Sequence, residues 1–393
     1  MDSLPIEKAS NLSDFEHLLK SDDFGSIPLL LPNSIKEGGT LGCSLGLTQL
    51  ILTWARKAKD RTVYTYLEET DTAKQTKFVS RVHGIAAAYF ADSVKAEKGA
   101  GGEIRRKLLA TARPRITAMH QGDLEGSGKG SEIELIFIEN AKHEFHGSLY
   151  SKAPTPSEIA DPEKHGHLIR PRKDLNRFLA KCFRHLKVEA KIRKHLQDKD
   201  LPFGSLLAEA FRNTADHAYL DPSGSRLHRN LRCVRIARTQ TSRNRIGSFE
   251  VAAPSAKTAA SRYFGELADR SSKYPRENVD ILELSVFDSG RGFSQTMGSS
   301  NEGSGQSEEQ LINHCFEKHR SSKEQENSGV GIFRMLRAVH ELGGFIRIRT
   351  STAEAFFGSS ADFSPDMPPS DYVHGGLVNV EGTLITVGVP VLF

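Results

Sequence analysis

Cysteine is scarce in this chain, with four residues in 393, and no Cys-x-x-Cys pair occurs. That spacing argues against a disulfide framework and against a cysteine zinc site, so a reducing compartment is expected. Long apolar runs are also missing, and none approaches the ~20 residues that a membrane-spanning helix needs. The N-terminal MDSLPIEKAS has neither the basic nor the apolar region of a signal peptide. We therefore expect a cytoplasmic protein that makes no contact with a membrane.

Charge is nearly balanced, with 53 Lys and Arg against 49 Asp and Glu and a net charge of +4. The basic residues are unevenly spread, however. Residues 164–199 hold twelve Lys or Arg against three acids, and residues 226–245 hold seven Arg and no acid. Two interpretations stay open: a surface that binds nucleic acid or another polyanion, or a solvated basic helix followed by an arginine-rich strand.

The chain is long for one domain and natural for two. Residues 1–24 are polar and acidic, which predicts a flexible arm. Strands alternate with helices over residues 25–150, which predicts a smaller α/β module. Residues 151–195 predict a linker and a basic helix, and residues 196–393 hold the motifs that carry chemistry.

Within the N-terminal module the hydrophobic pattern predicts individual elements. Strands are expected at residues 26–32, 61–69 and 132–140. The expected helices are 45–58, 77–97 and 103–112. No motif in this module can be assigned to chemistry.

The stretch AEAFRNTADHAYLD, residues 208–221, is helical by composition. Glu209, Asn213 and Asp216 are spaced so that they form a stripe on one face of that helix. The opposite stripe, which includes Phe211, is small or apolar and suits burial. The helix therefore carries a carboxylate and an amide one turn apart on one face and packs its other face into a core.

Two glycine motifs follow in the same half of the chain. A buried strand ends at Asp288 and breaks into Gly290 and Gly292, which permits close approach of a ligand to the backbone. Residues 293–327 have the composition of a mobile lid. Gly329-Val330-Gly331 then opens an amphipathic helix, whose free N–H groups suit phosphate. The last strand contains Gly382-Thr383.

The order of these motifs resembles the GHKL ATPase superfamily, the histidine-kinase-like ATP-binding fold. The resemblance covers about residues 195–393. It implies an α+β architecture: a two-layer sandwich of a mixed, mostly antiparallel sheet backed by helices, with ATP between the helices and the lid. The smaller α/β module would precede it.

The resemblance also implies roles for the residues near the phosphates. Asn213 would hold Mg²⁺ through its amide oxygen, since Mg²⁺ needs few protein oxygens when phosphates and waters supply the rest. Glu209 would be the base that activates water or a hydroxyl group for attack on the γ-phosphate. Lys323, in the lid, would reach that phosphate, and Asp216 would contribute to nucleotide binding.

On the adenine side, the resemblance implies that Asp288 accepts the amino group of the base and that Thr383 supports this contact. Backbone that approaches the nucleotide would come from both glycine motifs: Gly290, Gly292, Gly329, Val330 and Gly331.

Glu209 bears on the subclass, because conventional histidine kinases generally carry Asn at the matching place. Three functions remain open: an ATP-driven conformational switch with slow hydrolysis, a serine/threonine kinase of the anti-sigma-factor type, and an ATP-dependent nucleic-acid-binding module. EAFRNTADHAY resembles the matching segment of the anti-sigma-factor kinases, which supports the second function. A histidine-kinase-like regulatory protein is a further form of this alternative. The expected partners are ATP, another protein, a second copy of the chain, and nucleic acid at the basic stretches.

Overall fold

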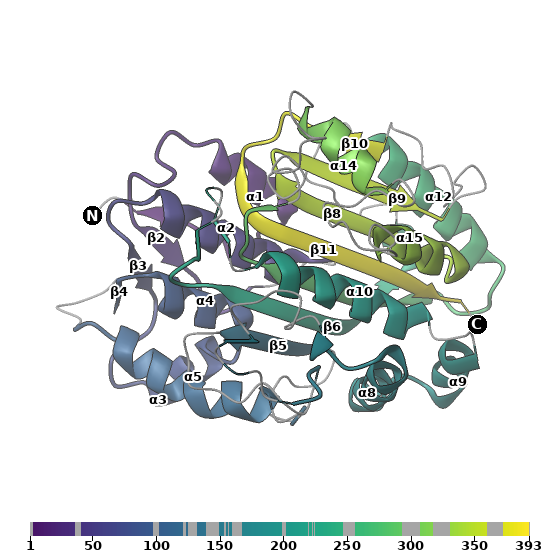
Figure 1. The fold of residues 1–393 in the computed structure, drawn as a ribbon, viewed down its shortest axis with the longest axis horizontal. Coiled ribbons are helices and arrows are strands. Elements are labelled where there is room, and N and C mark those ends of the chain that lie inside the picture. Colours follow the sequence, from purple (N-terminus) through teal and green to yellow (C-terminus); the bar gives the residue numbers. More distant parts are fainter. Residues whose placement is uncertain are drawn as a thin grey trace.

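The chain forms two sheets with helices packed around them in a computed structural model (Figure 1). The ranges that the structure describes are 3–35, 41–96, 102–120, 123–124, 132–138, 149–152, 155, 157–158, 167–198, 202–218, 220–221, 223, 225–246, 256–292, 307–316, 331–359 and 372–392.

The first sheet is parallel and has four strands in the order β1-β2-β3-β4. Its strands are β1 (Leu4–Pro5), β2 (Leu29–Leu31), β3 (Thr62–Thr65) and β4 (Ser93–Ala96). The helices of this region are α1 (Leu12–Leu19), α2 (Cys43–Lys57), α3 (Thr72–Phe78), α4 (Val82–Phe90) and α5 (Arg105–His120). The single helix predicted at 77–97 is therefore wrong: the chain turns between α3 and α4 and then forms β4.

Within the described ranges, the second sheet has seven strands in the order β10-β9-β8-β11-β7-β6-β5. All of its pairings are antiparallel, so the prediction of a mixed sheet is wrong. Its strands are β5 (Glu132–Ile138), β6 (Leu231–Ser242), β7 (Asn278–Asp288), β8 (Phe345–Ser351), β9 (Ala353–Gly358), β10 (Val373–His374) and β11 (Val380–Val391). The helices of this half are α8 (Arg172–His185), α9 (Ala190–Asp198), α10 (Pro202–His217), α11 (Arg243–Ile246), α12 (Lys257–Ser272), α14 (Glu308–Phe316) and α15 (Gly331–Glu341).

One face of the second sheet is apolar. Leu135, Val234, Val286, Ile385 and Ile348 lie in register across five strands and are all buried. Side chains alternate along a strand, so residues in register share a face. Helices α10 and α15 cover this face (Figure 1). Hydrophobic burial of this kind is the main favourable term in folding.

The other face carries charged and hydroxyl side chains. The neighbouring row reads Glu134, Arg235, Ser285, Thr386 and Arg347, and these residues are buried as well. Helix α2 covers the row from the N-terminal region and donates a hydrogen bond from the Ser44 hydroxyl to Glu134 at 2.7 Å. The sheet therefore lies between two helical layers, and the two-layer prediction omitted the second of them.

Two of the predicted boundaries are also wrong. The sequence predicts that residues 132–138 belong to the N-terminal module, yet they form β5, which pairs with β6 at the edge of the second sheet. The predicted flexible arm is instead folded. Strand β1 pairs with β2, and α1 begins with a capping box in which Asn11 and Asp14 exchange hydrogen bonds.

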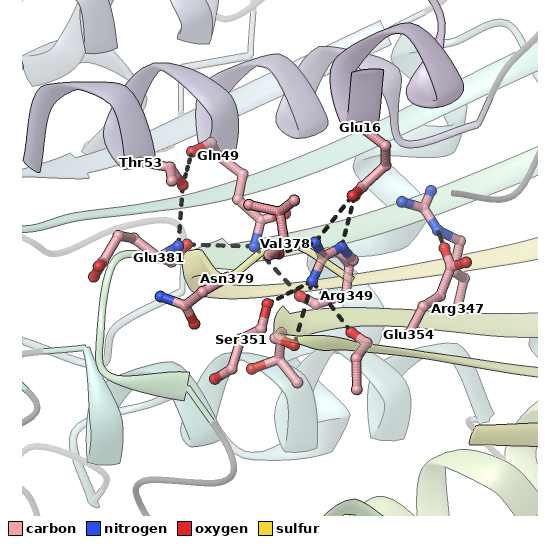
Figure 2. Close-up of polar contacts among 12 residues, drawn as sticks. Glu16, Gln49, Thr53, Arg347, Arg349, Ser351, Glu354, Val378, Asn379 and Glu381 are labelled. Atoms are coloured by element: carbon pink, nitrogen blue, oxygen red, sulfur yellow. Dashed lines mark hydrogen bonds and ion pairs between the residues drawn. The ribbon is translucent and has the colours of Figure 1, made fainter. Parts of the chain in front are cut away.

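Buried ion pairs explain why the first residues are held. Glu16 on α1 accepts hydrogen bonds at 2.8 and 3.2 Å from Arg349 on β8, and both side chains are less than a tenth exposed (Figure 2). The guanidinium of Arg349 also donates to the backbone carbonyls of Ser351 and Val378. A charge this deep in the molecule requires such partners.

Replacing Glu16 with Ala tests whether this segment is part of the core. The change removes the Glu16 carboxylate and leaves the buried charge of Arg349 without its ion-pair partner. We therefore expect the free energy of unfolding to fall by about 3–5 kcal/mol. Alanine favours helix more than glutamate, so helix propensity opposes the loss. The measurement is denaturant unfolding, with Arg177→Ala as the control because Arg177 is 71% exposed and its ion pair is superficial. A loss below 1 kcal/mol would restore the flexible-arm prediction.

Candidate functional site

Helix α10 brings Glu209 and Asn213 to the start of α15. A Cβ atom placed on Gly331, the first residue of α15, would lie 3.3 Å from Glu209 Oε2 and 3.8 Å from Asn213 Oδ1. The carboxylate and the amide are thus next to the glycine that opens the helix, as their order in the sequence suggests. The N-terminus of a helix attracts anions, which makes this junction suitable for a phosphate group.

Glu209 is buried and is surrounded by arginines. Its Oε1 accepts from Arg172 of α8 at 2.8 Å and from Arg334 of α15 at 3.2 Å. Arg212, one turn along α10, lies 3.6 Å from its Oε2. The carboxylate is therefore ion-paired in this structure, mainly through Oε1.

Asp288 and Thr383 belong to one row of residues across four neighbouring strands. Thr350 of β8, Thr383 of β11, Asp288 of β7 and Arg232 of β6 are in register and share the face that α10 and α15 cover. The two threonine hydroxyls are 3.2 Å apart. Asp288 and Thr383 are thus brought together, and Thr350, which has no predicted role, joins them.

Asp288 lies at the end of β7 and is 6% exposed. Burial raises the pKa of its carboxyl group from 3.8 to about 7, while a hydrogen bond from the Gly290 N–H and the charges of Arg232 and Arg56 act in the opposite direction. The carboxyl group can accordingly carry a proton near neutral pH. Such a perturbed acid at the end of a buried strand is typical of binding and catalytic sites.

Backbone geometry at this row depends on glycine. Gly292 has φ +81°, and a Cβ atom there would come within 2.6 Å of Ser351 Oγ. Gly382 has φ +76°, and a Cβ atom there would collide with the carbonyl oxygen of Asp288. Both positions combine a left-handed backbone with close packing, so only glycine fits them without strain.

Arg232 connects the row to α10. Its guanidinium lies 5.3 to 5.9 Å from the ring centroids of Phe137, Tyr150 and Phe211. Cation–π contacts of this kind stabilise a charge that is removed from water. Phe211 lies on α10, so Arg232 joins this helix to the row that contains Asp288.

The opposite face of the sheet supports the row through α2. The Gln49 amide donates to the backbone oxygens of Arg349, Glu381 and Gly382 at 3.3 to 3.4 Å, and Thr53 accepts from the Glu381 N–H (Figure 2). Arg56 extends the contact. It bonds the Glu381 carboxylate at 2.5 Å and the carbonyl of Ser289, the residue after Asp288, at 2.6 Å.

Several predicted site residues lie outside the described ranges: Lys323, Gly329 and Val330. The predicted lid, 293–327, is described only at 307–316, and most of this segment forms α14. Asp216 belongs to α10, but its side chain is outside what the structure describes.

Two arginines at the centre of the stretch 226–245 are buried and add nothing to a basic surface. Arg232 and Arg235 are 0% and 2% exposed, and Arg235 is paired with Glu132 and Glu283 at 2.9 and 2.6 Å. The reason is that β6 is an inner strand with helices over both faces. Within 164–199, by contrast, the basic side chains of α8 alternate with buried ones and include exposed Arg177 and Lys181.

Sequence reasoning missed the residues that contact the motifs from elsewhere in the chain. Arg172 belongs to the basic stretch 164–199, and no spacing rule links it to Glu209. Gln49 and Arg56 lie in a helix assigned to a separate module. The sequence offers one signal for these contacts, the polar side of α2. Because the first thirteen residues of this helix are all buried, its polar side chains need partners inside the protein.

A hollow lies at the opposite ends of β6, β7 and β11, lined by Gln240, Tyr274, Asp280 and Val391. Asp280 is bound there to Arg238 at 2.7 Å. This hollow holds none of the predicted site residues. The α10–α15 junction is the better candidate.

Comparisons of the chain with protein-family models, with curated proteins and with solved structures gave no match. Across the described ranges, no helix combines the length and the apolar character that crossing a membrane requires. In those same ranges, no three His, Cys, Asp or Glu side chains are grouped to hold a metal ion. An ion held mainly by phosphate oxygens needs no such group.

The raised pKa of Asp288 predicts a pH-dependent stability difference between wild type and Asp288→Asn. The folded state binds the proton more tightly than the unfolded state, so this stabilising contribution is complete below pH 3.8 and is lost as the pH rises through about 7. The asparagine stays neutral. Relative to wild type, we expect the variant's free energy of unfolding to rise over that interval, by about 4 kcal/mol at most, and to level off above it.

Denaturant unfolding of both proteins at several pH values between 4 and 8 measures the difference. His83, whose pKa burial lowers to about 4, titrates in both proteins, so its contribution cancels. A difference that is constant with pH would show that Asp288 ionises in the folded state as it does in water.

Proposed function

We propose that the chain is an Mg-ATP-binding ATPase of the GHKL type that acts as a nucleotide-driven conformational switch. The observation that supports this most is the convergence of Glu209 and Asn213 with Gly331, residues from two motifs more than a hundred positions apart. The pairing of Asp288 with Thr383 on the same layer adds a second support.

In this proposal the triphosphate binds at the N-terminus of α15, where backbone N–H groups and guanidinium groups surround it. Asn213 would hold the Mg²⁺ ion through its amide oxygen, and the bound ion would neutralise charge on the phosphates. Asp288 accepts the adenine amino group at the other end of the site. Glu209 takes the proton of the attacking water.

The structure also supports a route from the nucleotide to the N-terminal helices. Gln49 and Arg56 contact the backbone of Gly382 and Ser289, directly behind Thr383 and Asp288. Closure of the site around ATP would shift these backbone segments and therefore α2. The partner that reads such a change is a protein in this proposal, and the contacts in the described ranges do not favour nucleic acid at 226–245.

ATP turnover tests the proposed function. We expect wild type to hydrolyse Mg-ATP and Glu209→Ala to bind ATP while its turnover falls about 10²–10⁴-fold, because a general base is lost. Asp288→Asn should bind ATP at least about tenfold more weakly, since a partner of the adenine amino group is altered. Phosphate release and calorimetric titration are the measurements.

Glu341→Ala is the matched control, because Glu341 is an exposed glutamate of α15 that pairs with Arg337 on the surface. It should retain wild-type turnover. Tight ATP binding by wild type without phosphate release would favour the kinase alternative and direct the search to a protein hydroxyl group. Failure of wild type to bind ATP would refute the proposed function.

A further inference from the structure

Three arginines from three different helices meet at one carboxylate. Arg172 of α8, Arg212 of α10 and Arg334 of α15 lie 2.8, 3.6 and 3.2 Å from the Glu209 oxygens. In the described part of the chain, each of them makes its ion pair with Glu209 and with no other acid. Three cations therefore share one anion.

Exposure divides this cluster into a fixed part and a movable part. The Glu209 side chain is 6% exposed, whereas the side chains of Arg172, Arg212 and Arg334 are each about two-fifths exposed, at 41–42%. A buried carboxylate is held strongly by its partners. A half-exposed arginine can exchange one anion for another at small cost, because water solvates it during the exchange.

The carboxylate also occupies a place that favours anions in general. Glu209 Oε2 lies beside Gly331, at the N-terminus of α15, where the helix dipole adds to the positive field of the guanidinium groups. Guanidinium groups bind phosphate with paired hydrogen bonds, so a triphosphate would compete with Glu209 for the same donors.

Arg172 differs from the other two because α8 lies outside the α10–α15 pair. A Cβ atom on Gly204 of α10 would touch Asn176 and would lie 3.0 Å from the Arg172 carbonyl oxygen, so the two helices are in close backbone contact. This contact restrains helix movement. The Arg172 side chain can rotate, and any exchange of partners at this position is therefore a side-chain event.

We propose that Arg172 is an ATP-dependent latch on Glu209: it holds the carboxylate in the nucleotide-free protein and transfers to the terminal phosphate when ATP binds. The proposal rests on the proposed function. Once released, Glu209 accepts a proton from water as the water oxygen bonds to the γ-phosphorus. The bond from that phosphorus to the β,γ-bridging oxygen breaks, its electron pair leaves with ADP, and the proton passes to the phosphate product.

The consequence is selectivity for the triphosphate, because ADP lacks the group that takes Arg172 away from Glu209. Calorimetric titration of ATP and ADP into Arg172→Ala tests it. We expect ATP affinity to fall at least about tenfold and ADP affinity to change less than about twofold. Arg172→Lys keeps the charge without the paired donors and should recover part of the loss.

The matched control is Arg177→Ala, an arginine on the same helix that is 71% exposed and pairs with Asp174. It should bind both nucleotides as wild type does. Equal losses for ATP and ADP in Arg172→Ala, or no loss for either, would overturn the latch while leaving ATP binding itself established.

Inorganic tripolyphosphate separates the latch from the proposed function, since it needs no adenine pocket. Glu209→Gln removes the competing charge but keeps the shape, so this variant should bind tripolyphosphate at least about tenfold more tightly than wild type. If wild type fails to bind ATP and this increase is still seen, the nucleotide proposal fails and the exchange of anions stands. If tripolyphosphate binds both proteins equally, the latch is wrong.

Discussion

Burial of both faces of the seven-stranded sheet is the constraint on which the rest of the molecule depends. An inner strand such as β7 has no solvent side, so each residue along it must be apolar or must find a polar partner inside the protein. On the α10–α15 face, apolar packing meets this requirement. On the other face it is met by paired charges, of which Arg235 with Glu283 and Arg347 with Glu354 are examples. The N-terminal helices close that second face.

The candidate site occurs where this constraint is relaxed, at the ends of the strands. Asp288 is the last residue of β7, and its carboxyl group is buried without a full complement of charge partners. Glu209 is the opposite case, a buried carboxylate with more guanidinium groups than it can neutralise. Burial raises the pKa of the Asp288 carboxyl group, whereas the Glu209 carboxylate is surrounded by guanidinium groups.

Much of the fold around the site could be predicted because its signals are local. The apolar face of α15 and the buried run that ends at Asp288 give periodic patterns, and both elements lie where the sequence indicates. The burial of both faces of β6 and β8 could not be predicted from the alternation of apolar and polar residues, because Arg235 and Arg349 resemble solvent-facing residues. Arg235 is paired with Glu283 and Glu132, and Arg349 is paired with Glu16, which lies 333 positions away. No pattern within one segment carries that information. The same holds for Arg172 beside Glu209.

Strand order adds a consequence for how the molecule assembles. Strand β11 is inserted between β8 and β7, although it is the last described strand in the chain. On the ribosome, the sheet therefore stays divided into two incomplete halves until residues 380–391 emerge, and Arg56 of α2 lacks the Glu381 carboxylate during that time. Pairing over such sequence distances slows folding and leaves strand edges open to other chains. Synthesis of this protein should accordingly depend on chaperones that shield sheet edges more than its size alone would suggest.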